Sequence, residues 1–461
     1  MRDRILNTLH ELRRHAVSKG VQADFYYHEE QSALMRFANS AISLNTNEHL
    51  IRLDITAYDG HKRTNAGLIT DLSKLDEMKQ ALDQAAGMLA HAQPLSYVPT
   101  IPEFKGDFVQ EQGFDPALGG MSNEDKLAFF NQAAAGLESD EQRLSGIFSS
   151  GTNVIAQAST RSEHTQYFQT SDAQVSAVLA HAKLKWEVQA EQSAHCRADL
   201  DADALHRELA FLLERYQHDA PLQLPLGRYD LVFGPAAIAE LIMFSSFIGF
   251  DGGTMKRGYS FLSEEKVGQK VFSDKFTLVD DPTRLETFPF RRDFTGRERQ
   301  PFPLVEAGVF RGFTWVQDEA DEFGAKPTGH TVTHNSLYLH GGDQAVGSLE
   351  ELVKLPRSKD VLYFPFLHYT NIVNPSKGLL TGSSRFGTLL LRPDGSIGVP
   401  YNVRLTQSLP DIFGTRLAWL ARDVTAYNIS QSYGSRDPNA ILVPRFLQVD
   451  DLEISHSNSS Y

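Results

Sequence analysis

The order of the predicted elements repeats once within the first 217 residues, and this repeat constrains the fold more than any other feature. Each copy is predicted as a helix, then strands, then a second helix. Apolar residues three or four apart indicate the helices, and strict alternation of apolar and polar residues indicates the strands. Identity between the copies is weak, so the duplication rests on element order. We expect the copies at residues 1–92 and 121–217, joined by a segment rich in proline and glycine.

Helix-start signals and strands of alternating polarity indicate where the elements of both copies begin and end. Ser73 and Asp76 resemble a capping box, in which a serine and an acidic side chain satisfy the free N–H groups of a helix start. The predicted helices are Ile5–Val17, one after Asp71-Leu72-Ser73, one beginning at Ser122 and one opened by Asp199-Leu200-Asp201, and the clearest strands are Ile51–Ala57 and Leu184–Ala190.

After residue 227 the chain changes to short strands joined by tight turns. Pro393–Ser396 between two apolar runs is a strong hairpin signal, and Glu306–Gly308 is a weaker one. Helices are predicted at Ala236–Phe250 and after Ser408. The fold class is therefore α+β: a duplicated N-terminal α/β-sheet region at 1–218, a break at 220–227, and a β-rich C-terminal domain at 227–461.

Charge and cysteine content limit the possible partners. The net charge of −14 comes without a Lys/Arg run, so the chain lacks the basic face that duplex binding needs. A single cysteine excludes an intrachain disulfide and fits a reducing compartment. The most apolar stretch, residues 231–250, is interrupted by Gly234-Pro235 and Glu240, so we expect a buried helix there and not a membrane span. We expect a cytoplasmic protein that binds neither nucleic acid nor membrane.

Five segments stand in order along the chain: Arg36–Ile42, Val267–Val271 with Thr277–Pro282, Leu304–Phe313, Lys326–Gly329, and Pro444–Leu447 through Leu452–Ile454. They resemble, in turn, an opening "RFANN-x-I" strand, a central block, a "VLIEDGVLKGY" hairpin, a "KPTGN" turn and a closing "PSLLVEGLTI" strand. These motifs are signatures of the TldD/PmbA family, bacterial and archaeal proteins associated with peptide maturation and historically called modulators of gyrase.

The resemblance implies an N-terminal α+β part and a β-rich C-terminal part, assembled as dimers, with a catalytic subunit that is a zinc peptidase. That subunit carries an HExxxH helix shortly before an "RKGxSxF" stretch, and a cysteine further along. Two imidazoles and a third ligand would hold Zn²⁺, while the glutamate would take a proton from the metal-bound water.

This sequence departs from that pattern at the metal ligands. Lys256–Phe261 matches the landmark, and counting back places Met243, Phe244 and Ile248 where the first histidine, the glutamate and the second histidine would stand. A shift of one residue restores nothing, because no histidine occurs between His218 and His330 and the back half has no cysteine. The resemblance is therefore to the PmbA/TldE-like branch without HExxxH, and we expect no cofactor, with zinc only on a partner subunit.

The histidines that could still bind a metal or a substrate are gathered in the segment from His330 to His334, with His340 and His368 beyond it. Three intervening residues suit two metal ligands on one helical face, but the Thr-Val-Thr between them disfavours a helix. We interpret these as polar loop histidines; the alternatives are contact with a substrate or partner, and a metal site formed by His330 and His334.

Two further groups have both a chemical and a structural interpretation. Asp280-Asp281 has the form of a paired-carboxylate acid/base device, but Pro282 after it favours a strand end and a turn. Cys196 lies between His195 and Arg197, a basic neighbourhood that lowers a thiol pKa, and the structural interpretation is again preferred.

Three functions remain. The chain is a non-catalytic subunit that pairs with a TldD-like HExxxH homologue, with itself, or with both, and that handles peptide substrates. Alternatively it is an autonomous metallopeptidase that uses atypical ligands such as His330 and His334. In the third, it is a peptide-binding scaffold without a peptidase partner, which extends bound peptides by strand addition. The sequence favours the first, in which the chain is inactive alone.

Overall fold

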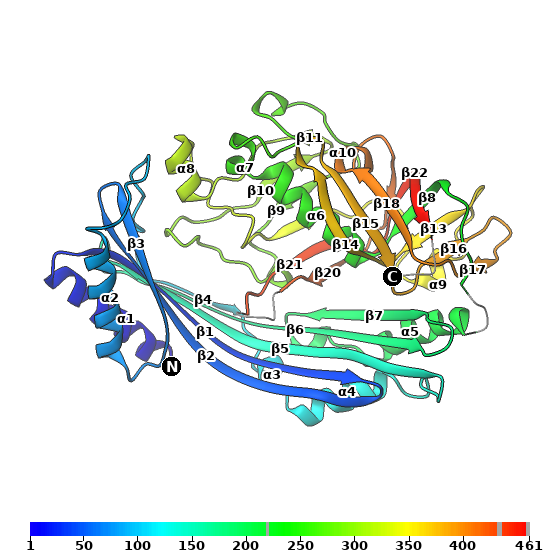
Figure 1. The fold of residues 1–461 in the computed structure, drawn as a ribbon, viewed down its shortest axis with the longest axis horizontal. Helices are drawn as coiled ribbons and strands as arrows, with labels where there is room; N and C mark the ends of the chain where they lie inside the picture. Colours follow the sequence, from blue (N-terminus) through cyan, green and yellow to red (C-terminus); the bar gives the residue numbers. More distant parts are fainter. Residues whose placement is uncertain (218–220, 431–435, 458–461) are drawn as a thin grey trace.

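The N-terminal half of the computed structural model forms one long sheet of seven strands that bends beneath the C-terminal half (Figure 1). The structure describes residues 1–217, 221–430 and 436–457. The predicted break at 220–227 therefore begins outside the described residues. The strand order is β3-β2-β1-β5-β6, with β4 and β7 both pairing with β6. The strands are β1 (Gln22–Ala38), β2 (Ala41–Asp59), β3 (Lys62–Thr70), β4 (Phe108–Gly113), β5 (Gln142–Ser159), β6 (Gln166–His181) and β7 (Glu187–Ala194).

The order helix, three strands, helix occurs twice in this half. Each copy is a helix, three antiparallel strands and a helix, and the copies meet where β1 pairs antiparallel with β5 from Asp24–Ser159 to Phe37–Gly146. An antiparallel junction relates the two three-stranded units by an approximate two-fold axis through the sheet. The helices are α1 (Arg2–Ser18) and α2 (Leu75–Met88) in the first copy, α4 (Asn123–Ala133) and α5 (Ala202–Tyr216) in the second, with the short α3 (Pro116–Gly119) between them.

The two faces of this sheet differ in polarity. Alternate residues of a strand point to opposite faces, and on one face of β1 the side chains of Phe25, Tyr27, Met35 and Phe37 pack into cores that also contain residues of the helices. The opposite face is covered by the C-terminal half and is largely polar, apart from a small apolar cluster around Ile155 and Phe168. Its buried polar residues include His28, Glu30, Ser149, Asn153, Gln157, Gln166, Thr170 and Asp172.

Arg436 fixes the C-terminal half to this polar face. Its guanidinium binds Asp172 in a bidentate pair, with Nε–Oδ1 at 2.8 Å and Nη2–Oδ2 at 2.7 Å, and Nη1 donates to Ser149 Oγ at 2.9 Å. Arg436 and Asp172 are 4% and 0% exposed. A Cβ on Gly151 would meet the Arg436 side chain at 2.5 Å, so the glycine leaves room for it. A buried, hydrogen-bonded ion pair is costly to break, so this contact stabilises the docking of the two halves.

The C-terminal half contains two sheets with α6 (Pro235–Ser245) between them, where the helix contacts β14, β20 and β21 (Figure 1). The first sheet has the order β11-β10-β9-β12-β21-β20. The second has the order β14-β15-β18-β22-β8-β13-β16-β17, with β19 added beside β22. The bounds are β8 (Gly227–Phe233), β9 (Leu278–Asp280), β10 (Phe302–Glu306), β11 (Val309–Phe310), β12 (Leu337–Leu339), β13 (Val361–Phe364), β14 (Phe366–Asn374), β15 (Leu379–Arg385), β16 (Leu389–Leu391), β17 (Ile397–Gly398), β18 (Val403–Ser408), β19 (Leu417–Leu420), β20 (Val424–Asn428), β21 (Ala440–Pro444) and β22 (Leu447–Ser457), with helices α7 (Gly252–Lys256), α8 (Gln317–Phe323), α9 (Leu349–Leu352) and α10 (Leu409–Ile412).

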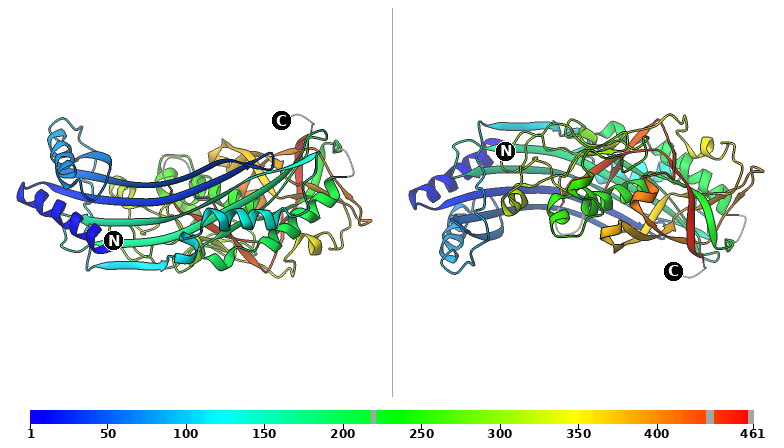
Figure 2. Two further views of the ribbon diagram at one scale, coloured as in Figure 1. Left: turned by 90° about the horizontal axis from the view of Figure 1, so that it is seen from below. Right: turned by 90° about the horizontal axis from the view of Figure 1, so that it is seen from above.

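The two ends of the long sheet differ in their relation to the C-terminal half. Helices α1 and α2 lie at the far end, and their core contains only N-terminal residues (Figure 2). The core of α5 continues from Leu205 and Leu209 into Val232, Tyr363 and Phe446 of the C-terminal half. The second copy is therefore joined to the C-terminal half by a continuous core. The α+β prediction is confirmed.

Predictions of helix starts and hairpins were correct where no neighbouring side chain competed for the same hydrogen bonds. Ser122 and Asp125 form a capping box on α4, and the hairpins β10–β11 and β16–β17 form as predicted. The box at Ser73 was wrong, because Asp71 accepts the Ser73 N–H at 2.8 Å and draws the serine into a turn. Two predicted elements also differ in extent. Strand β7 begins only at Glu187, after the positive φ of Lys185, and the helix after Ser408 is the single turn α10.

Candidate functional site

Helix α6 ends in a turn of π-helix at Ser246–Phe250, directly where the sequence aligns with an HExxxH motif. Residues five apart on a regular α-helix point about 140° away from each other, at about 3.6 residues per turn. A π turn contains more residues per turn and reduces that angle, and such turns are rare and often mark functional sites. The helix therefore has a backbone suited to an i,i+5 pair such as Met243 and Ile248.

The side chains at these positions carry none of the matching chemistry. Met243 and Phe244 are half-buried and pack against the C-terminal core, and Ile248 is 4% exposed within it. Thioether, phenyl and alkyl groups neither coordinate Zn²⁺ in the way imidazoles do nor accept a proton from water. At the end of α6, the structure thus places Ile248 in the core of the C-terminal half and Met243 and Phe244 against that core.

The landmark Lys256–Phe261 folds back onto the π turn. Phe261 N–H donates to Ile248 O at 3.0 Å, and Ser260 Oγ donates to Gly249 O at 3.2 Å. A Cβ on Gly249 would meet the Phe261 ring at 2.8 Å, so the ring lies directly against the turn. Because a π turn leaves carbonyl groups outside the regular helical ladder, these partners satisfy them and stabilise the irregular backbone.

His330 is buried in an ionic network and not presented to a site. Its Nδ1 lies 2.8 Å from Asp280 Oδ2, its ring stacks on Phe302, and Arg299 Nη2 donates to Asp280 Oδ1 at 2.9 Å. Burial alone would raise the pKa of Asp280, but Arg299 and His330 outweigh it and lower the pKa. The neighbouring Asp281 accepts from Thr283 N–H at 3.0 Å, so Asp280-Asp281 ends a strand and forms a turn as the sequence predicts.

The other histidines of this region pack against aromatic rings. His334 lies edge-on to Phe290 and Phe294, and burial lowers its pKa. His340 stacks on Tyr338 with the ring centroids 4.4 Å apart, while His368 contacts Tyr369. Burial lowers the pKa of His340 and of His368 as well. The segment from His330 to His334 is a loop, as predicted.

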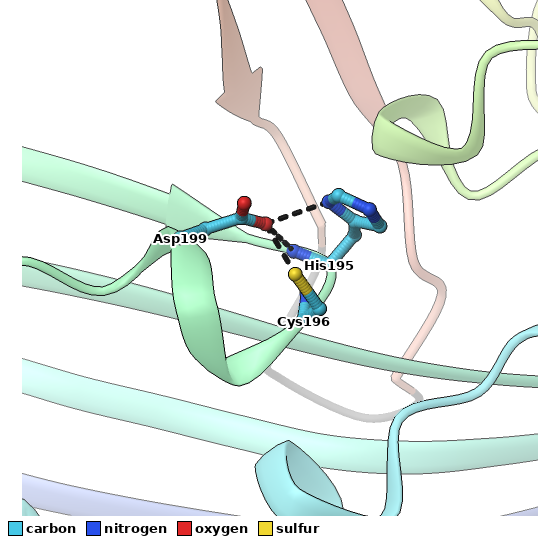
Figure 3. A group of neighbouring side chains, drawn as sticks. All are labelled: His195, Cys196 and Asp199. Carbon is cyan, nitrogen blue, oxygen red and sulfur yellow. Dashed lines mark hydrogen bonds and ion pairs between the residues drawn. The ribbon is translucent and has the colours of Figure 1, made fainter.

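Within the described residues, one set of three His, Cys, Asp or Glu side chains brings its ligand atoms within 4.8 Å of one another: His195, Cys196 and Asp199 (Figure 3). Asp199 Oδ2 lies 2.6 Å from His195 Nδ1 and accepts from the backbone N–H groups of His195 and Cys196. Burial opposes these hydrogen bonds, but they lower the pKa of Asp199 to about 2.

The same contacts disfavour reactivity of the thiol. Burial and the charge of Asp199 raise the pKa of Cys196, whereas a ligand or nucleophile needs the thiolate. The hydrogen bond to Asp199 raises the pKa of His195, which favours an imidazolium. A protonated imidazole and a protonated thiol are poor ligands, so this group closes the turn between β7 and α5, in line with the structural interpretation of Cys196.

Comparison with known proteins assigns the C-terminal half to a known family. Residues 226–456, half of the chain, match the family described as the PmbA/TldA metallopeptidase C-terminal domain. The chain belongs to the TldD/PmbA family, and is thereby related to metallopeptidases.

Solved structures extend the likeness to nearly the whole chain. The structure of TldE from Thermococcus kodakarensis superimposes with a TM-score of 0.79 at 16% identity, covering 97% of this chain and 100% of that one. A candidate modulator of DNA gyrase from Thermotoga maritima gives a TM-score of 0.75 at 14% identity, covering 96% and 98%. At such identities the likeness is one of fold.

A relative in sequence is a protein named metalloprotease from Methanothermobacter thermautotrophicus. It is 27% identical over 139 residues, which cover 28% of this chain and 30% of the relative. The chain thus matches less than a third of that protein's length.

Sequence reasoning did not find two features. The π turn left no recognisable signal, because it depends on contacts with Ser260 and Phe261. Two acidic side chains, Glu191 and Glu208, line a cavity between the halves of the molecule. Glu191 did carry a signal: it is a charged residue within an otherwise half-buried alternating strand, and such positions are costly unless used or paired.

Proposed function

We propose that this chain is a non-catalytic subunit of a TldD/PmbA-type zinc metallopeptidase that matures or degrades peptides. The observation that carries the proposal is the end of α6, where the backbone has a π turn while Met243, Phe244 and Ile248 stand at the positions of the two histidines and the glutamate of HExxxH. A chain with this helix can contribute part of the wall of an active-site chamber but cannot bind the catalytic metal there. The likeness in fold to TldE agrees with the proposal.

The proposed partner is an HExxxH homologue or a second copy, bound through the C-terminal half. Strand β14 is an edge of its sheet, and three apolar side chains on it are exposed: Tyr369 (65%), Ile372 (40%) and Val373 (53%). Exposed edges with apolar side chains are commonly covered by another chain. Light scattering of the purified chain should therefore give a dimer; a monomer near 51.4 kDa, both alone and with the homologue, would contradict this.

Activity provides the direct test. Alone, the chain should hydrolyse no unfolded peptide, with or without added zinc, and elemental analysis should find no stoichiometric transition metal. Mixed with an HExxxH homologue from the same organism, it should raise cleavage or be required for it. The assay compares each chain separately with the mixture, and a chelator should abolish turnover only where the homologue is present.

The alternative of an autonomous metallopeptidase predicts turnover by this chain alone, lost on changing His330 or His334. The geometry disfavours it, because His330 is bound to Asp280 and His334 lies between two phenyl rings. A peptide-binding scaffold is favoured only by the β14 edge, which suits strand addition. Peptide binding by the isolated chain, with no effect on any homologue's activity, would support the scaffold.

The compartment and the excluded partners remain part of the proposal. Among the described residues, none of the helices has the length and apolar character that a bilayer crossing requires. We propose a cytoplasmic location, and the net charge of −14 argues against a nucleic-acid partner.

A further inference from the structure

A cavity of about 430 Å³ lies where the second N-terminal copy meets the C-terminal half. Strand β7 and helix α5 form one wall. The start of α6, helix α9, strand β20 and the link between β13 and β14 form the other. This is the end of α6 opposite to the π turn, so the cavity is separate from the HExxxH-like positions. Cavities between two parts of a chain are preferred places for small ligands.

Acidic groups outnumber basic groups in the lining. The carboxyl groups of Glu191, Glu208 and Glu350, with Asp199 and Asp201 at the start of α5, face two guanidinium groups, those of Arg207 and Arg445. The phenol rings of Tyr363 and Tyr427 are also in the wall. The excess of negative charge selects for a cationic ligand.

Glu191 is the best evidence that the cavity is built for such a ligand. Its Oε1 accepts from Gln189 Nε2, while its Oε2 is shielded from solvent and forms no well-aligned hydrogen bond, although the hydroxyl groups of Ser176 and Tyr427 are close enough to lower the pKa. An unsatisfied, desolvated carboxylate oxygen is costly, and a cation in the cavity would remove that cost.

Burial gives the carboxyl groups an unusual ionisation. It raises the pKa of Glu191 to about 7, against the lowering effect of Tyr427, Ser176 and Gln189. It also raises the pKa of Glu208 to about 7, where Arg445 lowers and Glu350 raises the value. Near neutral pH both groups therefore ionise readily when a positive charge arrives and remain partly protonated when the cavity lacks one.

We propose that this cavity binds an organic cation: a ligand whose ammonium or guanidinium group is held by Glu191 and Glu208 and lies against the rings of Tyr363 and Tyr427. A compact metal ion fits less well, because among the described residues the carboxyl groups of the cavity do not bring three ligand atoms within 4.8 Å of one another. A larger cation spans such a spacing, and aromatic faces attract it. The inference is independent of any peptidase partner.

Titration calorimetry on the full chain tests the proposal with two sources of the same chemistry: spermidine as a free amine, and a short peptide with a free N-terminus and one arginine. At least one should bind saturably, and a neutral diol of similar length should not. Mg²⁺ and Ca²⁺ should bind more weakly than the organic cation. Whichever of the two ligands binds more tightly shows whether the cation comes from a free amine or from a peptide.

Two variants and a matched control locate the site. Glu191→Gln and Glu208→Gln should each weaken binding roughly tenfold. Glu214→Gln, on the same helix as Glu208 but outside the cavity lining, should leave it unchanged. Thermal unfolding checks that each variant folds. If one variant does not fold, the other still tests the site by itself. Affinity should also fall roughly tenfold from pH 8 to pH 6 as the carboxyl groups take up protons.

Saturable binding that depends on both glutamates and on pH supports the proposal. No binding at millimolar spermidine or peptide overturns it, as does binding that survives both substitutions. Tighter binding of a divalent metal at the same glutamates would also overturn it in favour of an inorganic site.

Discussion

The two ends of helix α6 differ in a way that separates backbone shape from side-chain chemistry. At its start, Pro235 and Ala236 border a cavity lined by ionisable groups; at its end, a π turn carries only apolar side chains at the aligned positions. One end has titratable groups around an ordinary helix start, whereas the other has an irregular backbone without titratable groups. Shape and chemistry are thus specified by different residues, and each is open to change without the other.

The π turn is specified from outside the helix. Ser260 and Phe261 bind its carbonyl groups, and Gly249 admits the Phe261 ring. None of these residues is a position where the resemblance places a ligand. The turn therefore persists whichever side chains occupy Met243, Phe244 and Ile248, which leads to the largest of the expected effects.

Replacing the apolar pair by histidines should create a metal site. We expect Met243→His with Ile248→His to bind Zn²⁺ or Ni²⁺ with a dissociation constant near the micromolar range, about −8 kcal/mol, where the unaltered chain binds neither. The π turn is the reason, since it brings positions five apart toward the same side. Calorimetry with chelator reversal measures it.

The control moves one histidine within the same turn. Met243→His with Phe247→His has the spacing of a regular helix and should bind at least an order of magnitude more weakly. Equal affinity for the two pairs would show that the π turn contributes nothing, and the contrast between the ends of α6 would then be one of side chains alone.

The cavity end depends on docking of the two halves, whereas the π turn lies within one half. Asp172→Ala leaves the buried Arg436 guanidinium without its partner and should lower the free energy of unfolding by about 3–5 kcal/mol. Urea titration measures the loss. Glu141→Ala, which removes an exposed ion pair with Lys183, should leave the stability nearly unchanged.

A double replacement separates charge from packing. Asp172→Leu with Arg436→Met removes both charges and should recover most of the lost stability. If the double variant is as unstable as Asp172→Ala, the contact stabilises by shape and not by ion pairing.

The smallest expected effect is a pH dependence at the cavity end. The folded-state pKa values of Glu191 and Glu208, raised to about 7 from an ordinary 4.5, favour folding fully below pH 4.5, and this contribution is lost as pH rises to about 7. Glu191→Gln with Glu208→Gln mimics the protonated pair. It should match the unaltered chain at pH 4.5 and be more stable than it at pH 8, where the unaltered pair is ionised.

Thermal unfolding at both pH values, without added amines, checks this. The exposed Glu214→Gln serves as the reference variant and should show no pH-dependent difference. A double variant that is less stable at pH 8 would mean that the carboxylates are paired in the free protein.

Local chemistry could be predicted from the sequence, whereas chemistry that depends on tertiary contacts could not. The start of the helix at Ser122 and the hairpin at Pro393–Ser396 follow from residues close in sequence. The absence of histidine near Met243 was likewise evident from the sequence alone. The cap at Ser73 was mispredicted because Asp71, two residues away, competes for the same hydroxyl.

The candidate site shows where such reasoning ends. The π turn requires the later Ser260 and Phe261, and the cavity requires Glu191 and Glu208 to meet α9 and β20. Neither arrangement produces a periodic pattern in the sequence, because each depends on how segments far apart in the chain pack together. A metal site at His330 stayed open as an alternative for the same reason: its partner Asp280 is 50 residues earlier in the chain.

The antiparallel seam between β1 and β5 has a consequence for how the chain is made. Residues that pair across it are 109 to 135 positions apart, from Phe37–Gly146 to Asp24–Ser159. At about 5–20 residues per second, a ribosome takes roughly 5–25 s to deliver the partner strand. Throughout that interval β1 is an open edge, on which strands of other nascent chains can assemble. The consecutive ionisable residues His28, Glu29 and Glu30 lie in the middle of that edge, where they oppose such pairing until β5 arrives.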